Sequence, residues 1–204
     1  MDRLREVLED ARLGLEAHDR LREESLRLSR ECIRACREAI GVLHRGNRED
    51  YAARLLGASQ LLARLREAVG GDILLWERGA GFDAQQEVAE AALAGAVIGN
   101  SALPTPDELG VVPLAWLHGL GDAVGELRRE ALERIRGGDA EGAAALFSAM
   151  EEAYDGLSSF DYPDAVSNNL RRRVDVARSL VERTHGEVVA ALRQREMEQR
   201  LKGP

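Results

Sequence analysis

The chain has 204 residues, of which 45% are hydrophobic and only 4% aromatic, and its formal net charge is −8. This length fits one domain with an aliphatic core, and the negative charge excludes a general attraction to phosphate, so nucleic-acid binding would need a local basic patch. The first residues are charged, and no apolar run has the length of a signal peptide or a membrane span. We therefore expect a cytoplasmic protein.

The first half of the chain predicts three helices. Apolar residues recur at helical spacing from residue 2 to about residue 44, which predicts one long first helix. Gly46 and Asn47 signal its end and the start of a second helix over about 48–69. Gly70 and Gly71 end that helix, and an Ala-rich third helix is expected to begin near Asp83.

The second half predicts three more helices after a proline-containing break over 99–112. Pro113 fits the first turn of a fourth helix that ends near 137–138, and Asp139 fits the cap of a fifth that ends near 154–156. Pro163 opens a long sixth helix that extends to about residue 194. Its apolar seam has nearly heptad spacing and comprises Val166, Leu170, Val174, Ala177, Val181, Thr184, Val188 and Ala191.

These patterns predict an all-α fold, an elongated bundle of about six to seven helices that forms a single domain over 1–204. The first and last helices would each be roughly 60 Å long at 1.5 Å per residue. Helices of that length in a small chain are often shared with neighbouring subunits, and the seam on the last helix favours the same interpretation. Cys32 and Cys36 lie one helical turn apart, which indicates reduced, buried thiols.

Four acids are the candidates for chemistry, because phosphate-binding loops, dinucleotide fingerprints and cysteine-rich zinc patterns are absent. Glu87 and Glu90 share a face of the third helix, and Asp122 and Glu126 share a face of the fourth. A packed group of four carboxylates is costly unless a cation such as Mg²⁺ or Mn²⁺ neutralises it. The alternative interpretation is two ordinary pairs of solvated acids.

Arginines on the first helix supply the local basic patch. Arg27, Arg30, Arg34 and Arg37 are spaced three, four and three residues apart, which gathers them within about 80° beside the apolar face. Between Arg22 and Arg66 there are ten arginines and six acids, a local charge of +4. The pattern indicates phosphate binding, and a solvated helix face balanced by glutamates is the alternative.

Four segments resemble the translin/TRAX family in the same order. They are L-S-R-E-C-I-R with A-I-G-V-L-H-R-G-N (28–34 and 39–47), Q-E-V-A-E-A (86–91), Y-D-G-L-S (154–158) and L-R-R-R-V-D (170–175). A fifth, L-H-G-L-G-D-A-V-G-E-L (117–127), is similar to the catalytic TRAX branch. By this resemblance, Glu87, Glu90, Asp122 and Glu126 correspond to the metal-binding catalytic acids of TRAX. Val88 departs from the family pattern, which has Tyr there.

The resemblance implies a translin-like member of prokaryotic type that forms a hollow homo-octamer, with RNA and active sites inside. It implies a Mg²⁺- or Mn²⁺-dependent endoribonuclease acting on single-stranded RNA, with single-stranded DNA as a further ligand. Arg27, Arg30, Arg34, Arg37, His44 and Arg45 would hold the nucleic-acid backbone. Two alternatives remain open: a non-catalytic binder of single-stranded nucleic acid, and a structural helical oligomer. Whether a second translin-like chain joins the assembly is also open.

Overall fold

The computed structural model describes residues 1–202, which form nine helices and no strand. The all-α prediction is therefore confirmed. Six helices are long: α1 (Asp2–Leu43), α2 (Arg48–Ala68), α4 (Gly79–Gly99), α6 (Pro113–Arg136), α7 (Ala140–Ser158) and α9 (Leu170–Lys202). Three are short: α3 (Ile73–Glu77), α5 (Pro106–Leu109) and α8 (Asp164–Ser167).

The predicted helix boundaries have local causes that the structure makes visible. The side chain of Asn47 accepts a hydrogen bond from the Asp50 amide at the start of α2, and Asp139 accepts one from the Gly142 amide at the start of α7. Pro113 occupies the first turn of α6, where its missing N–H costs nothing. Because these caps satisfy amides that have no partner within the helix, the helices begin where the sequence indicates.

The structure differs from the sequence prediction at two helix starts. The helix expected to begin near Asp83 already begins at Gly79. The long helix expected to start at Pro163 is divided in two, because Asn168 and Asn169 have φ values of 50° and 61°. That left-handed backbone is tolerated by asparagine but ends an α-helix, so α8 and α9 are separate.

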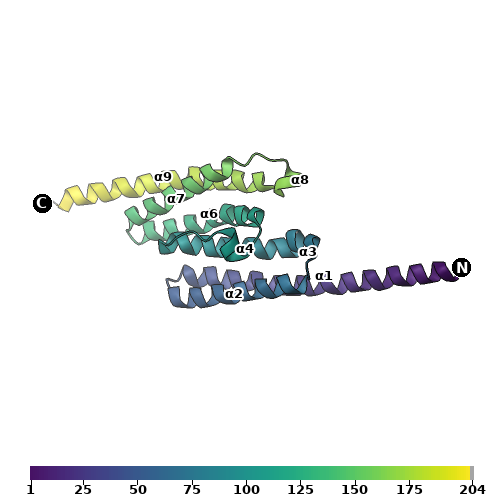
Figure 1. Ribbon diagram of the computed structural model, residues 1–204. Coiled ribbons are helices and arrows are strands. Elements are labelled where there is room, and N and C mark those ends of the chain that lie inside the picture. The colour runs from purple at the N-terminus through teal and green to yellow at the C-terminus, as the bar shows by residue number, and fades with distance from the viewer. Residues whose placement is uncertain (203–204) are drawn as a thin grey trace.

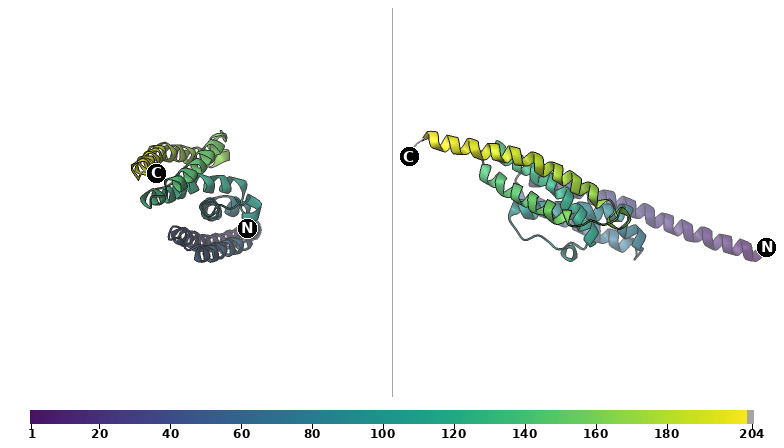
Figure 2. Two further views of the ribbon diagram at one scale, coloured as in Figure 1. Left: turned by 90° about the vertical axis from the view of Figure 1, so that its left-hand side faces the viewer. Right: turned by 90° about the horizontal axis from the view of Figure 1, so that it is seen from above.

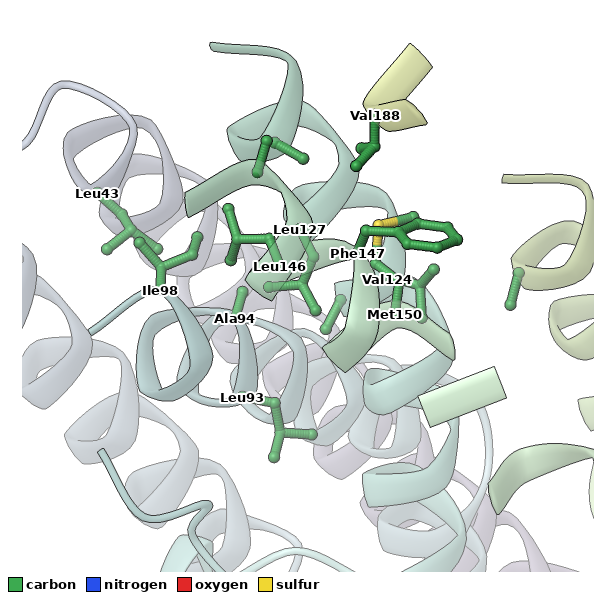
Figure 3. Close-up of a cluster of buried hydrophobic side chains, with 14 of the residues drawn as sticks. Leu43, Leu93, Ala94, Ile98, Val124, Leu127, Leu146, Phe147, Met150 and Val188 are labelled. Carbon is green, nitrogen blue, oxygen red and sulfur yellow. The ribbon is translucent and has the colours of Figure 1, made fainter. Parts of the chain in front are cut away.

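The long helices form three layers (Figure 1, and in end view in Figure 2). The first layer contains α1 and α2, the second α4 and α6, and the third α7 and α9. The Ala-rich α4 is buried on most of its surface and contributes to two apolar clusters. One cluster joins α4 to α1 and α2, and the other joins it to α6, α7 and α9 (Figure 3).

The apolar seam of the last helix packs inside the chain. Ala177, Thr184 and Val188 are at most 3% exposed, and α9 packs against α6 and α7. The expectation that this seam faces a neighbouring subunit is therefore wrong for its buried part, since the chain's own core takes it up. Cys32 and Cys36 are both buried and free, as predicted.

The two ends of the chain project in opposite directions from the layered body (Figure 2). Every residue from 1 to 20 is exposed, although this segment is the first half of α1. Within residues 1–202, no helix combines the length and hydrophobicity needed to cross a membrane.

Candidate active site

The helices that carry the four candidate acids cross closely at Gly119 of α6. A Cβ atom at this position would lie 2.6 Å from the Ala89 Cβ and 2.7 Å from the Glu90 backbone nitrogen on α4. Only glycine permits this approach, because the opposing atoms include rigid backbone. The crossing lies beside Glu90 and less than one turn before Asp122, so it brings the two predicted acid pairs together.

Three of the four acids line one cavity of about 310 Å³. They are Glu87 and Glu90 from α4 and Glu126 from α6, and the wall is completed by Arg37, Ile40 and Gly41 of α1 and Arg129 of α6. The cavity therefore lies between three helices that are far apart in sequence and is open to solvent. It combines acids with two arginines whose charge has the opposite sign.

Burial and mutual repulsion disturb the acids of α4. Desolvation raises the pKa of Glu90 to about 8, and the nearby charges of Asp122, Glu87 and Glu126 add to the effect. Desolvation also raises the pKa of Glu87, although Arg37 opposes this. Burial is the larger cause of both shifts, repulsion from the neighbouring carboxylates adds to it, and Arg37 offsets the two only in part.

Asp122 is held by two polar partners on neighbouring helices. Its Oδ2 accepts hydrogen bonds from Gln86 Nε2 at 2.6 Å and from Arg173 Nε at 3.2 Å. Arg173 also donates to the Gln86 side chain at 2.9 Å, which closes a three-membered network. The network links α4, α6 and α9 and fixes the orientation of the Asp122 carboxylate.

Glu126 is held from the other side by His44, the residue that follows the last turn of α1. The Nε2 of His44 lies 2.5 Å from Glu126 Oε2, and its Nδ1 lies 3.4 Å from Glu130 Oε2. The His44 side chain is only 4% exposed. Its hydrogen bond lowers the pKa of Glu126, because it favours the ionised carboxylate. His44 thus contacts the acidic site in this structure and does not extend the exposed surface of α1.

The predicted arginine stripe lies on α1 beside this cavity. Arg30, Arg34, Arg37 and Arg45 are exposed, and Arg37 Nη2 lies 3.5 Å from Glu87 Oε1. Arg27 donates to Glu24 and Glu31 at 2.8 and 2.6 Å, so its charge is already balanced within α1. The stripe therefore begins as free guanidinium groups at Arg30 and leads directly to the acids.

The acids are not arranged as a finished metal site. Among residues 1–202, no three His, Cys, Asp or Glu side chains have positions suited to one ion. The contacts of Asp122 with Arg173 and of Glu126 with His44 account for this arrangement, since each draws a carboxylate toward a basic partner. The donor set itself consists of carboxylate oxygens, which suit Mg²⁺ and Mn²⁺.

Four further residues of the site had no role in the sequence prediction. Gln86 and Arg173 lie within two of the segments that carry the family resemblance, yet only the fold shows that they meet at Asp122. Arg129 and Glu130 follow Glu126 by three and four residues on α6. That spacing is a usable signal, because it places them on the face of the acids.

Comparisons with known proteins find relatives that align with most of the chain, although no protein-family model matches its sequence. An uncharacterized protein of Methanocaldococcus jannaschii is 31% identical over 188 residues, which cover 90% of this chain and 82% of that protein.

Solved structures give the same result. A structure of AfC3PO with duplex RNA is 33% identical with a TM-score of 0.84, over 92% of this chain and 97% of that chain. A crystal structure of AfC3PO is 34% identical with a TM-score of 0.84, over 92% and 98% of the two chains. The apo form of NeC3PO shares the fold at 20% identity, with a TM-score of 0.80 over 90% of this chain and 96% of that chain. On this identity and coverage, the chain belongs to the C3PO/translin family.

Proposed function

We propose that this protein is an endoribonuclease that binds single-stranded RNA along the α1 arginines and cleaves it at the adjoining acids. The observation that carries the proposal is the junction of the two features, where Arg37 lies 3.5 Å from Glu87 in a shared cavity. An exposed basic stripe that leads into clustered carboxylates is the arrangement needed to deliver a phosphodiester to a hydrolytic site.

The arginines of the cavity would hold the phosphate that reacts. Arg37 and Arg129 line the cavity together with the acids, and their side chains are 71% and 60% exposed. A guanidinium group forms paired hydrogen bonds with phosphate oxygens. Its positive charge would also offset the repulsion between the phosphate and the acids. Such contacts reach the backbone and not the base edges, so we expect little sequence preference.

Glu87, Glu90, Asp122 and Glu126 would hold a Mg²⁺ or Mn²⁺ ion. The fit rests on the oxygen donor set and on the raised pKa of Glu90, since burial and then repulsion penalise its charge and a cation would offset both. A bound ion of this kind supplies a Lewis acid and lowers the pKa of water. Asp122 and Glu126 would be oriented by Arg173 and His44, which already fix their carboxylates.

One of the four acids would be left outside the ligands of the ion, and Glu90 is the candidate, because its raised pKa of about 8 lies near neutral pH. Its carboxylate would accept the proton of the attacking water as the water oxygen bonds to phosphorus and the bond to the leaving ribose oxygen breaks. The leaving oxygen would take its proton from solvent. Glu87 is less suited to this role, because Arg37 opposes the rise of its pKa.

We propose that the active form is a closed homo-octamer that encloses the RNA.

AfC3PO has been solved with duplex RNA, so duplex is the natural competitor to single-stranded RNA as the ligand of this chain. Labelled single-stranded and duplex RNA of one sequence should therefore be compared directly.

The decisive experiment incubates each labelled RNA with the protein in Mg²⁺, in Mn²⁺ and in chelator, for wild type and for Glu87→Gln. We expect wild type to cut single-stranded RNA only with a divalent ion. Glu87→Gln, which keeps the shape and removes the charge, should lose cutting by at least about 100-fold and keep RNA binding. Equal cutting by both proteins would contradict the assignment, and preferential cutting of duplex would replace the proposed substrate.

A non-catalytic RNA-binding protein is the second candidate. The observation that favours it is the saturation of two acids by basic partners, Asp122 by Arg173 and Glu126 by His44. Metal-independent RNA binding without any cleavage by wild type would select this alternative.

A further inference from the structure

Within residues 1–202, the first half of α1 is exposed along its length, and its one ion pair to another segment joins His18 to Asp72. We call residues 1–20 the arm; every one of them is exposed, and the arm extends beyond the other helices (Figures 1 and 2). It is roughly 30 Å long at 1.5 Å per residue. Most of the stability of a helix comes from the packing of its apolar face, and along the arm that face is exposed to water. Leu4, Leu8 and Leu15 are 53%, 60% and 72% exposed.

The apolar stripe of the arm has a spacing that suits pairing with itself. Leu4, Leu8, Ala11 and Leu15 follow one another at intervals of four, three and four residues, and this series reads the same in both directions. In an antiparallel pair related by a two-fold axis, Leu4 would oppose Leu15 and Leu8 would oppose Ala11 of the second copy. Leu8 of each copy then faces the small Ala11 of the other copy, which allows the two helices to pack closely.

Charges beside the stripe select the antiparallel orientation. Arg5 near its beginning and Glu16 near its end lie on the same side of the stripe. In the antiparallel pair, Arg5 of one copy lies within two residues of the level of Glu16 of the other, whereas in a parallel pair the two are eleven residues apart. Glu16 already binds Arg12 of its own chain at 2.7 Å, so it would lie between two arginines. The remaining acids near the start, at positions 2 and 6, lie on the opposite face of the helix.

In this pairing, the first residues of one arm would lie against the base of the other arm. The same pairing sets Met1 of one copy against His18 of the other, and His18 Nδ1 lies 3.6 Å from Asp72 Oδ2. Ile73 and Leu74 follow directly and are 66% and 72% exposed. These two side chains would cover Met1, which is itself 90% exposed. Exposed apolar residues thus occur at both places that the pairing joins.

We propose that the arm is a self-association surface whose partner is the arm of a second copy of this chain, packed antiparallel about a two-fold axis between residues 9 and 10. The pairing itself does not depend on the ribonuclease proposal. The consequence of the pairing for RNA binding does depend on that proposal. Because α1 continues into the arginine stripe, the two stripes would begin about 60 Å apart, at opposite ends of the pair. The pair is then a building unit of the proposed octamer.

The first test measures the mass of the particle by light scattering for wild type, for the double variant Leu8→Glu/Leu15→Glu and for Leu13→Glu. Leu13 is a matched control, because it is 50% exposed on the opposite face of the same arm. We expect the double variant to reduce the mass at least twofold and to lose helical circular dichroism, while the control keeps both. An unchanged mass in the double variant, at protein concentrations where wild type is oligomeric, would overturn the proposal.

The second test fixes the orientation by oxidative cross-linking. Cys32 and Cys36 are buried, so introduced thiols on the arm would react selectively. The variant Leu4→Cys/Leu15→Cys should give a covalent dimer, whereas Leu4→Cys alone should not. Efficient dimers from Leu4→Cys alone would indicate a parallel pair and contradict the proposal. Neither test uses RNA or metal, so its outcome is separate from that of the cleavage assay.

Discussion

The acidic cluster and the arginine stripe meet in one cavity, but they are built in different ways. The stripe lies on a single helix, where the spacing of Arg30, Arg34 and Arg37 alone sets their common face. The cluster requires α4 and α6 to cross at Gly119, and it needs partners from α1 and α9 to orient it. The stripe is thus a local feature of sequence, and the cluster is a product of tertiary structure.

The difference predicts different sensitivities to mutation. A substitution on the stripe should change RNA binding and leave the fold and the acids as they are. A substitution at the crossing should disturb the acids and leave the stripe in place. Three experiments follow from this contrast, beginning with the largest expected effect.

Gly119→Ala should damage the acidic cluster most. The added Cβ would lie within 2.8 Å of backbone atoms of α4, so the helices must separate. Overpacking of this kind costs about 1–3 kcal/mol, and a shift of about 1 Å between catalytic groups costs roughly 100-fold in rate. We expect a melting temperature lower by several degrees and a loss of cleavage about 100-fold, with RNA affinity nearly unchanged.

Gly125→Ala is the matched control on the same helix. A Cβ there would meet only the Leu180 Cδ1 at 3.9 Å, an ordinary contact. The alanine should therefore be neutral or slightly stabilising, by up to about 1 kcal/mol. Equal damage from both substitutions, in calorimetry and in cleavage, would show that the crossing at Gly119 is not special.

Arg30→Gln/Arg34→Gln should affect binding with no effect on the acids. Loss of two phosphate contacts should weaken binding of single-stranded RNA by about 10-fold and reduce the salt slope by about 1.4, at roughly 0.7 per contact. Arg178→Gln/Arg183→Gln removes the same charge from exposed positions of α9 and serves as the control. A fluorescence-anisotropy titration at several salt concentrations distinguishes the two, and equal losses would reduce the stripe to a general charge effect.

The same contrast explains how much the sequence could predict. The six long helices and the face of the stripe follow from periodicity and caps, because both are properties of neighbouring residues. The acids could be paired within each helix, but their meeting depended on how closely two helices cross. His44 illustrates the limit: the family resemblance implied a phosphate contact for it, whereas the fold buries it between Glu126 and Glu130.

The last segment of the chain shows a further limit. The near-heptad seam of α9 has the pattern of a helix shared between subunits, yet Ala177 and Val188 are buried within the chain. Periodicity reveals which face of a helix is apolar, but it does not reveal which surface covers that face. For α9 the covering surface is the chain's own α6 and α7.

Glu90→Gln gives the smallest expected effect on stability and tests the electrostatics of the cluster directly. The pKa of Glu90 in the folded protein is about 8, above the ordinary value of 4.5, so the folded state binds the proton more tightly than the unfolded state. Because proton binding is linked to folding, Glu90 does not change the free energy of unfolding below about pH 4.5. It lowers that free energy progressively as the pH rises from about 4.5 to about 8. Glutamine has no charge and avoids that cost. Because solvent and Arg37 screen the carboxylate, we expect a gain of only about 1 kcal/mol at pH 9.

Melting curves of both proteins at pH 5 and pH 9 provide the measurement. The variant should exceed wild type at pH 9 by more than at pH 5, and Mn²⁺ should reduce the difference by neutralising the wild-type cluster. A difference that is constant with pH would mean that neither burial nor repulsion penalises the Glu90 carboxylate, and the four acids would then be two independent surface pairs.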